Sequence, residues 1–107
     1  MAGVEPQPID GRLKVGITRN VKSGDVPVHG VRKLPERGTS GWYFWVGERS
    51  DGPDFFVTLH ASHLREWAPL VLPFLALPPG WRFLTDGTYK DVWFDEGVDL
   101  TPLPYEG

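Results

Sequence analysis

The sequence predicts an α+β fold, in which a small antiparallel sheet of about four or five strands carries one or two short helices on one face. Apolar residues alternate in several short segments, as in half-buried strands, and change to helical spacing only in the middle of the chain. Thirteen Gly and eleven Pro among 107 residues imply many turns. The helical segment lies between strand segments, where it can cover the sheet that they share.

The first half of the chain supplies three strand segments. Alternating apolar residues predict a strand at residues 13–19, and residues 26–31 form a second one, which Pro27 confines to an edge of the sheet. Residues 37–41 are expected to form a loop. The continuous apolar run at residues 42–46 then predicts a strand that is covered on both faces.

The second half supplies the helices and a hairpin. Helical spacing begins after Thr58, a residue type that caps helices, and it predicts one or two short helices within residues 58–76. A strand at residues 80–86, a Gly-Thr turn and a returning strand at residues 89–95 predict a β-hairpin.

Alternation along the returning strand separates a core face from a solvent face. Val92 and Phe94 share one face, whereas Asp91, Trp93 and Asp95 share the other. We expect the apolar pair to face the core and Trp93 to lie between two carboxylates on the wetter side. The residues predicted to form the core are Trp42 or Phe44, Trp81 or Phe83, Val92, Phe94, Leu64 and Leu75.

Length and composition favour one small domain. We expect a flexible tail at residues 1–12, a single α+β domain at residues 13–100 and a C-terminal tail at residues 101–107. The chain has no cysteine, so disulfides and thiolate chemistry are excluded. The sequence shows no apolar signal core and no run of the ~20 residues that cross a bilayer, which predicts a cytoplasmic protein without membrane contact.

Charge is distributed unevenly along the chain. Residues 1–50 contain eight Lys/Arg and five Asp/Glu, and residues 51–107 contain three Lys/Arg and nine Asp/Glu. Such asymmetry can attract an oppositely charged partner, although it also serves simply as a solubilising surface. Neither half has a dense Lys/Arg run, so the sequence predicts no binding to nucleic acid.

No group of residues predicts catalysis, a metal or a cofactor. Asp91 and Asp95 would lie ~13 Å apart along a strand, which is too far for joint acid–base work. His60 and His63 have a spacing that permits a shared metal, for which a third ligand would have to come from elsewhere, for example Asp54 or Glu66; no known metal motif accompanies them. The hydroxyls at Thr39 and Ser40 are interpreted as part of a turn. We therefore expect a binding protein and not an enzyme.

The five tryptophans leave an alternative function open. Aromatic rings stack on sugars and on aromatic ligands, and exposed tryptophans among Trp42, Trp45 and Trp93 would line such a groove. This alternative is a small-ligand binding module, and it differs from a protein-binding function in the size of its partner.

Several strings in residues 38–100 resemble a known family. They are Gly-Thr-Ser-Gly-Trp-Tyr at residues 38–43, Asp-Phe-Phe at 54–56, the Leu-His and His-Leu pairs at 59–64, Leu-Pro-Pro-Gly-Trp-Arg-Phe-Leu at 77–84, Tyr89, and Asp-Val-Trp-Phe-Asp at 91–95. Together they resemble the Immunity protein 33-like family, small bacterial proteins that are predicted antidotes encoded beside polymorphic toxins. Residues 1–37 do not contribute to the resemblance, which implies inhibition of a toxin by direct binding.

A binding role of this kind predicts a contact patch on the returning strand. We expect Asp91, Trp93, Asp95 and Glu96 to contact the cognate toxin, with Trp93 as the buried anchor and the acids providing steering and specificity. The acidic second half would suit a basic toxin surface. The free protein is expected to be a monomer that binds its toxin one to one.

Overall fold

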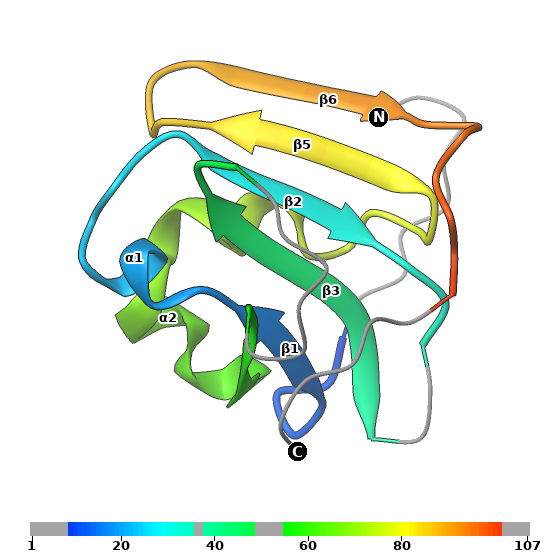
Figure 1. Ribbon diagram of the computed structural model, residues 1–107. Coiled ribbons are helices and arrows are strands. Elements are labelled where there is room, and N and C mark those ends of the chain that lie inside the picture. The colour runs from blue at the N-terminus through cyan, green and yellow to red at the C-terminus, as the bar shows by residue number, and fades with distance from the viewer. Residues whose placement is uncertain (1–8, 36–37, 49–54, 102–107) are drawn as a thin grey trace.

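The computed structural model describes residues 9–35, 38–48 and 55–101 (Figure 1). Most of the predicted tails, residues 1–12 and 101–107, therefore lie outside the described residues, although Ile9 packs against the core. No helix in the described ranges has the length and apolarity needed to span a membrane. With η denoting a 3-10 helix, the elements in chain order are β1 (Lys14–Ile17), α1 (Arg19–Lys22), β2 (Val28–Arg32), β3 (Thr39–Val46), β4 (Val57–His60), η1 (Ala61–His63), α2 (Leu64–Trp67), η2 (Pro69–Phe74), β5 (Trp81–Thr85) and β6 (Lys90–Phe94).

The α+β class is confirmed, but the sheet is larger than predicted and is not wholly antiparallel. Six strands lie in the order β4-β1-β3-β2-β5-β6, instead of four or five. β2 is paired on both sides, so the expectation that Pro27 confines it to an edge was wrong; Pro27 lies just before the strand, where its missing N–H costs no sheet bond. β1 runs parallel to β3, whereas the other four pairs of neighbours are antiparallel. Alternation of apolar residues is the same in parallel and antiparallel strands, so the pattern does not reveal direction.

The sixth strand arises where a helix was predicted. Residues 57–60 form β4, in which Val57 pairs with Ile17 and Leu59 pairs with Val15 of β1. Helical structure begins only at Ala61. The prediction of a helix starting after Thr58 was wrong there, because pairing with the free edge of β1 outweighs the weak local preference for helix. The helices do cover one face of the sheet, as predicted (Figure 1).

The main core lies between this helix-covered face and the helices. Phe83 of β5 stacks on Phe74 of η2, with ring centroids 4.3 Å apart, and it also contacts Phe44 of β3. Gly30 of β2 permits this packing, because a Cβ atom there would lie 2.1 Å from the Phe83 ring. Leu64 of α2 belongs to the same core and is fully buried. A tightly packed aromatic layer therefore joins the helices to the sheet.

A smaller core covers part of the opposite face, which we call the second face. It contains Val31, Tyr43, Trp45 and Phe56, with Val98 packed against them. After β6 the chain turns back toward the end of β2 (Figure 1), where the backbone N–H of Leu34 donates to the carbonyl of Leu100 at 3.1 Å and the Lys33 ammonium donates to the carbonyl of Asp99. The strand at residues 42–46 is therefore buried on both faces, as predicted.

β3 begins earlier than predicted, at Thr39. The prediction of a loop at residues 37–41 was therefore wrong for residues 39–41, and Arg37 lies outside the described residues. Ser40 is buried, and its hydroxyl donates to the carbonyl of Lys14 in β1 at 3.0 Å. Gly41 has φ +90°, and a Cβ atom there would lie 2.2 Å from a neighbouring carbonyl oxygen. Gly41 therefore permits a kink within β3 and does not belong to a loop before the strand.

The predicted core is confirmed except at Phe94. Trp42, Phe44, Leu64 and Phe83 are buried, and Val92, Leu75 and Trp81 pack against the core while keeping some exposure. Phe94 is 52% exposed, although it shares its face with Val92. β6 is the last strand of the sheet, and the phenyl ring meets Trp81 edge-on at 5.8 Å instead of entering the core.

Truncation of two phenylalanines tests this division. Phe83→Ala should lower the free energy of unfolding by about 3–5 kcal/mol, because it removes a ring packed on three sides. Phe94→Ala should lower it by about 1 kcal/mol or less, because half of this ring is already in water. Urea denaturation followed by tryptophan fluorescence measures both, and equal losses would place Phe94 in the core after all.

Candidate partner-binding site

One end of the second face carries a group of aromatic and charged side chains. Strand register brings them together, because Arg82 of β5 pairs with Trp93 of β6, while His29 of β2 pairs with both Trp45 of β3 and Leu84 of β5. Side chains of directly paired residues point to the same face of a sheet. The group, which we call the Arg82 cluster, consists of His29, Trp45, Arg82, Trp93 and Asp95.

Arg82 connects the members of the cluster. Its guanidinium carbon lies 6.0 Å from the ring centroid of Trp45 and 5.8 Å from that of Trp93. These distances are near the outer limit of cation–π attraction, about 6 Å. Nη1 of Arg82 donates to Oδ2 of Asp95 at 3.0 Å. His29 stacks on Trp45, with centroids 5.3 Å apart and planes 8° apart. One arginine thus orders side chains from β3, β6 and the residue after β6.

The Arg82 cluster is partly exposed to solvent. Trp45 is buried beneath it, whereas His29 and Trp93 are half-buried. The side chains of Arg82 and Asp95 are 27% and 28% exposed. Nε of Arg82 is buried and finds no hydrogen-bond acceptor within the described part of the chain. The guanidinium of Arg82 is therefore positioned by the two indole rings and by the carboxylate of Asp95, while its Nε–H donor stays unused.

Arg82 also influences protonation. Its hydrogen bond, followed by one from the backbone N–H of Gly97, lowers the pKa of Asp95 below the usual value for aspartate. Burial is the main reason that the pKa of His29 is lowered from its usual 6.5, and the nearby charge of Arg82 adds to this effect. At neutral pH the cluster therefore holds a carboxylate, a guanidinium and a neutral imidazole.

The four residues predicted to contact a partner lie along β6 and the turn after it. Trp93 and Asp95 belong to the Arg82 cluster. Asp91 is exposed on the same face, and the hydroxyl of Tyr89 lies 3.5 Å from its Oδ2. Glu96 is exposed just beyond the strand. Two of the four residues are thus joined through Arg82, and the other two flank them.

Sequence reasoning missed Arg82, His29 and Trp45 as members of the site. The place of Arg82 could have been predicted, because the short Gly-Thr turn of the predicted hairpin brings Arg82 near Trp93. His29 and Trp45 come from β2 and β3, far along the chain, and their neighbours follow only from the strand order. Trp45, expected as an exposed ligand-stacking residue in the alternative function, is instead 3% exposed, and Trp42 is fully buried.

The two histidines of the metal hypothesis lie close together, while Asp54, one of the residues considered as a third ligand, lies outside the described residues. The ring centroids of His60 and His63 are 6.5 Å apart. Across residues 9–35, 38–48 and 55–101, the structure contains no group of three or more His, Asp or Glu side chains placed to hold a metal ion.

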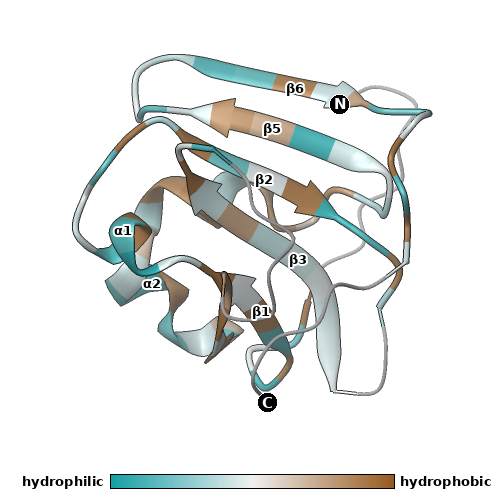
Figure 2. Cartoon of the chain, viewed as in Figure 1, coloured by the Kyte–Doolittle hydropathy of each residue, from teal (hydrophilic) through white to brown (hydrophobic). Residues whose placement is uncertain are grey.

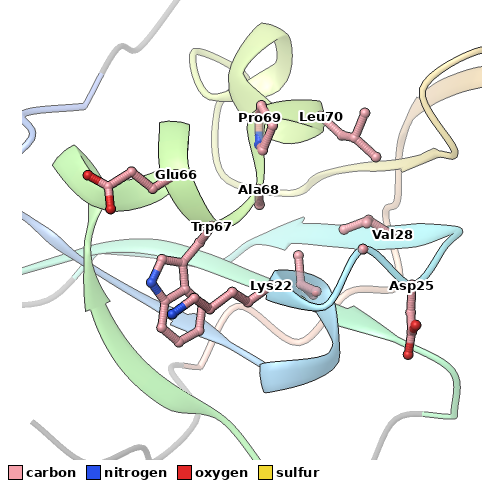
Figure 3. Close-up of a pocket in the computed structure, with 10 residues that line it drawn as sticks. Lys22, Asp25, Val28, Glu66, Trp67, Ala68, Pro69 and Leu70 are labelled. Carbon is pink, nitrogen blue, oxygen red and sulfur yellow. The ribbon is translucent and has the colours of Figure 1, made fainter.

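A cavity of about 180 Å³ lies away from the Arg82 cluster, between α1 and α2 (Figure 3). Trp67 of α2 lines it, and the ammonium of Lys22 lies 4.9 Å from the centroid of the tryptophan ring. The picture shows the Lys22 side chain lying along the indole, while the carboxylate of Glu66 points away. Apolar residues, including Val28 and Leu70, form most of the remaining wall, which Asp25 and Glu66 also line.

The link between Arg82 and His29 can be measured directly. Arg82→Met removes the positive charge but keeps most of the side-chain volume, so the pKa of His29 should rise toward its usual value while burial keeps it below about 6.5. NMR titration of the imidazole Cε1 proton reports this pKa. Lys22→Met removes an equal charge elsewhere and should leave the His29 titration unchanged. The same pKa in wild type and Arg82→Met would refute the electrostatic link.

The lowered pKa of His29 also has a consequence for stability. In the unfolded chain His29 takes up a proton near pH 6.5, whereas in the folded chain it does so only at lower pH. The contribution of a neutral His29 to the free energy of unfolding should therefore be fully present above about pH 6.5. It should decrease as the pH falls from there through the pKa of His29 in the folded chain. His29→Gln should remove this dependence in urea denaturation curves recorded between pH 5 and 7.5. An unchanged pH dependence would contradict a lowered pKa.

Comparison with known proteins gives one family. The model of the Imm33-like domain matches residues 1–95, a range that includes β1 to β6 and extends over residues 1–37, which the resemblance in the sequence had not covered. No curated protein and no solved structure matches the chain. The matched range is most of the 107 residues and confirms the resemblance, so this chain belongs to the Imm33-like family.

Proposed function

We propose that this chain is an immunity protein that neutralises a cognate bacterial toxin by direct binding, without catalysis. The contact surface in this proposal is the Arg82 cluster together with the flanking acids Asp91 and Glu96. The protein acts in the cytoplasm, is a monomer when free and forms a one-to-one complex with its toxin. Membership of the Imm33-like family supports a toxin as the partner.

The observation that carries the choice of surface is the arrangement of Arg82, Trp93 and Asp95. Trp93 rests on the guanidinium, and Asp95 holds the same group at 3.0 Å, so the aromatic ring and the carboxylate are oriented before a partner arrives. Tryptophan and arginine are the residue types most enriched among energetically dominant interface residues. Preorganisation on paired strands reduces the entropy that binding must overcome.

Charge supports a basic partner. Exposed carboxylates at Asp86, Asp91, Glu96 and Asp99 follow one another along the β5–β6 turn, β6 and the segment after it, with Lys90 the single lysine or arginine in residues 86–101. A surface of this sign accelerates encounter with a cationic protein and discriminates against acidic ones. A toxin with a basic working surface, such as a nuclease, has the complementary charge.

Binding through this surface is tested with two variants and a matched control. Trp93→Ala removes the aromatic anchor, and Asp95→Lys reverses a charge at the centre of the site; each should weaken affinity for the toxin by about tenfold or more. Asp25→Lys makes the same charge reversal at an exposed position beside α1 and should bind within about threefold of wild type. Calorimetry with the protein encoded by the neighbouring reading frame measures each affinity.

Cell protection provides the second readout of the same proposal. Cells expressing the toxin should survive with wild type or Asp25→Lys and should die with Trp93→Ala, provided that thermal melting shows all three proteins to be folded. Full protection by both Trp93→Ala and Asp95→Lys would show that the contact surface lies elsewhere. Failure of the wild-type chain to protect would contradict the antidote role itself.

The small-ligand alternative keeps Trp93 of the Arg82 cluster, loses two of its other tryptophans and gains a new one. Trp42 and Trp45 are buried, whereas Trp67 lines the cavity between α1 and α2. An aromatic ligand fits this site in chemical class, because the indole offers a stacking surface, while Lys22 and the lining carboxylates of Asp25 and Glu66 place both signs of charge around it. Saturable quenching of tryptophan fluorescence by benzoate or indole acetate, lost in Trp67→Phe, would favour this function. Unchanged fluorescence would leave direct protein binding as the better explanation.

A further inference from the structure

The outer edge of β6 differs from the rest of the sheet because its backbone is paired on one side only. β6 is the last strand in the sheet order, and β5 is its single neighbour among the described residues. The register from Trp81–Phe94 to Thr85–Lys90 runs without a bulge, and the strand contains no proline. Bulges and prolines are common means by which proteins prevent an edge from pairing with another chain.

Two hydrogen bonds establish which backbone groups point outward. The N–H of Asp95 donates to the carbonyl of Gly80 at 3.0 Å, and the carbonyl of Tyr89 accepts from the N–H of Asp86 at 3.3 Å. Both bonds point toward the β5 side. Bonding direction alternates from one residue to the next along an antiparallel strand. The backbone N–H and C=O groups of Asp91 and Trp93 therefore also point toward β5. The backbone N–H and C=O groups of Lys90, Val92 and Phe94 therefore point away from the sheet.

The side chains along this edge have different chemistry on the two faces. Val92 and the 52% exposed Phe94 extend the helix-covered face, whereas Asp91, Trp93 and Asp95 extend the second face. In Figure 2 the strand begins hydrophilic and becomes hydrophobic toward its middle. An additional strand would thus meet apolar groups on one face and carboxylates on the other.

We propose that a β-strand of the toxin pairs with the outer edge of β6 and continues the sheet. This inference rests on the proposed function and specifies its binding mode. The added strand carries Lys or Arg at alternate positions, which meet Asp91 and Asp95, and apolar residues between them, which cover Val92 and Phe94. Main-chain hydrogen bonds then supply affinity, while the alternating side chains supply specificity.

A second copy of this chain fits the edge less well. If two β6 strands paired antiparallel about Val92, Asp91 of one copy would lie opposite Trp93 of the other and diagonal to its Asp95, on the same face. Carboxylates in such diagonal positions are about 7–8 Å apart and repel each other. The chain as a whole carries a net charge of −3, which also opposes self-association.

Hydrogen exchange tests the open edge without any substitution. In the free protein, the amides of Lys90, Val92 and Phe94 should exchange fast, whereas those of Asp91, Trp93 and Asp95 should be protected by β5. Adding the toxin, produced from the neighbouring reading frame, should slow exchange at Val92 and Phe94 by about tenfold or more. An edge that is already protected in the free protein overturns the proposal; if that protection disappears on dilution, a second copy covers the edge.

Two substitutions of one residue separate the backbone from the side chain. Val92→Ala and Val92→Pro both reduce the side chain, but only proline removes the outward N–H, and the inward bonds to β5 remain. Val92→Ala is the reference. The affinity of Val92→Pro for the toxin should be lower than that of Val92→Ala by about tenfold or more. Circular dichroism checks that both variants are folded.

The outcomes distinguish the binding mode from the function. Weakened binding in Val92→Pro alone, with slowed exchange at Val92 in the wild-type complex, supports strand addition. Equal affinity of the two variants, or exchange at Val92 unaffected by the toxin, overturns strand addition and leaves the antidote role intact. A wild-type chain that neutralises no toxin overturns both. If Val92→Pro does not fold, the exchange measurement on the wild-type complex decides.

Discussion

The burial of β3 on both faces is the constraint on which the rest of the structure depends. Trp42 and Phe44 point to one face, and Tyr43 and Trp45 point to the other, and all four are almost fully removed from water. Burial of large aromatic side chains dominates the stability of a small core, so both faces must be covered. The short helices cover the first face, and Phe56 with the segment after β6 covers the second.

Each covering layer leaves a different part of the sheet open. On the helix-covered face, the packing centred on Phe83 reaches Val92 of the last strand but not Phe94, which remains half exposed over Trp81. On the second face, the returning chain bonds to Lys33 and Leu34 just after β2, and it leaves the Arg82 cluster accessible at the other end. The two openings meet at β6, the strand that carries most of the proposed contact surface.

The Arg82 cluster is ordered without contributing much to folding stability. Its ion pair is partly exposed, and such pairs add little to folding stability because water screens them and side-chain entropy opposes them. The same geometry nevertheless holds Trp93 and Asp95 in fixed orientations on paired strands. His29, neutral because of burial and of the nearby guanidinium, keeps the floor of the cluster uncharged at physiological pH.

The sequence by itself determined the class of the fold, the strand at residues 42–46, the hairpin and the two faces of β6, because all of these follow from the spacing of apolar residues along the chain. Its resemblance to the Imm33-like family also proved correct. Only the tertiary structure decided that β1 runs parallel to β3, that residues 57–60 form a strand, that Phe94 is exposed, and that Arg82 lies between Trp45 and Trp93. Spacing reports which side of a strand a residue occupies, whereas strand order and the extent of the covering layers depend on contacts between segments far apart in the chain.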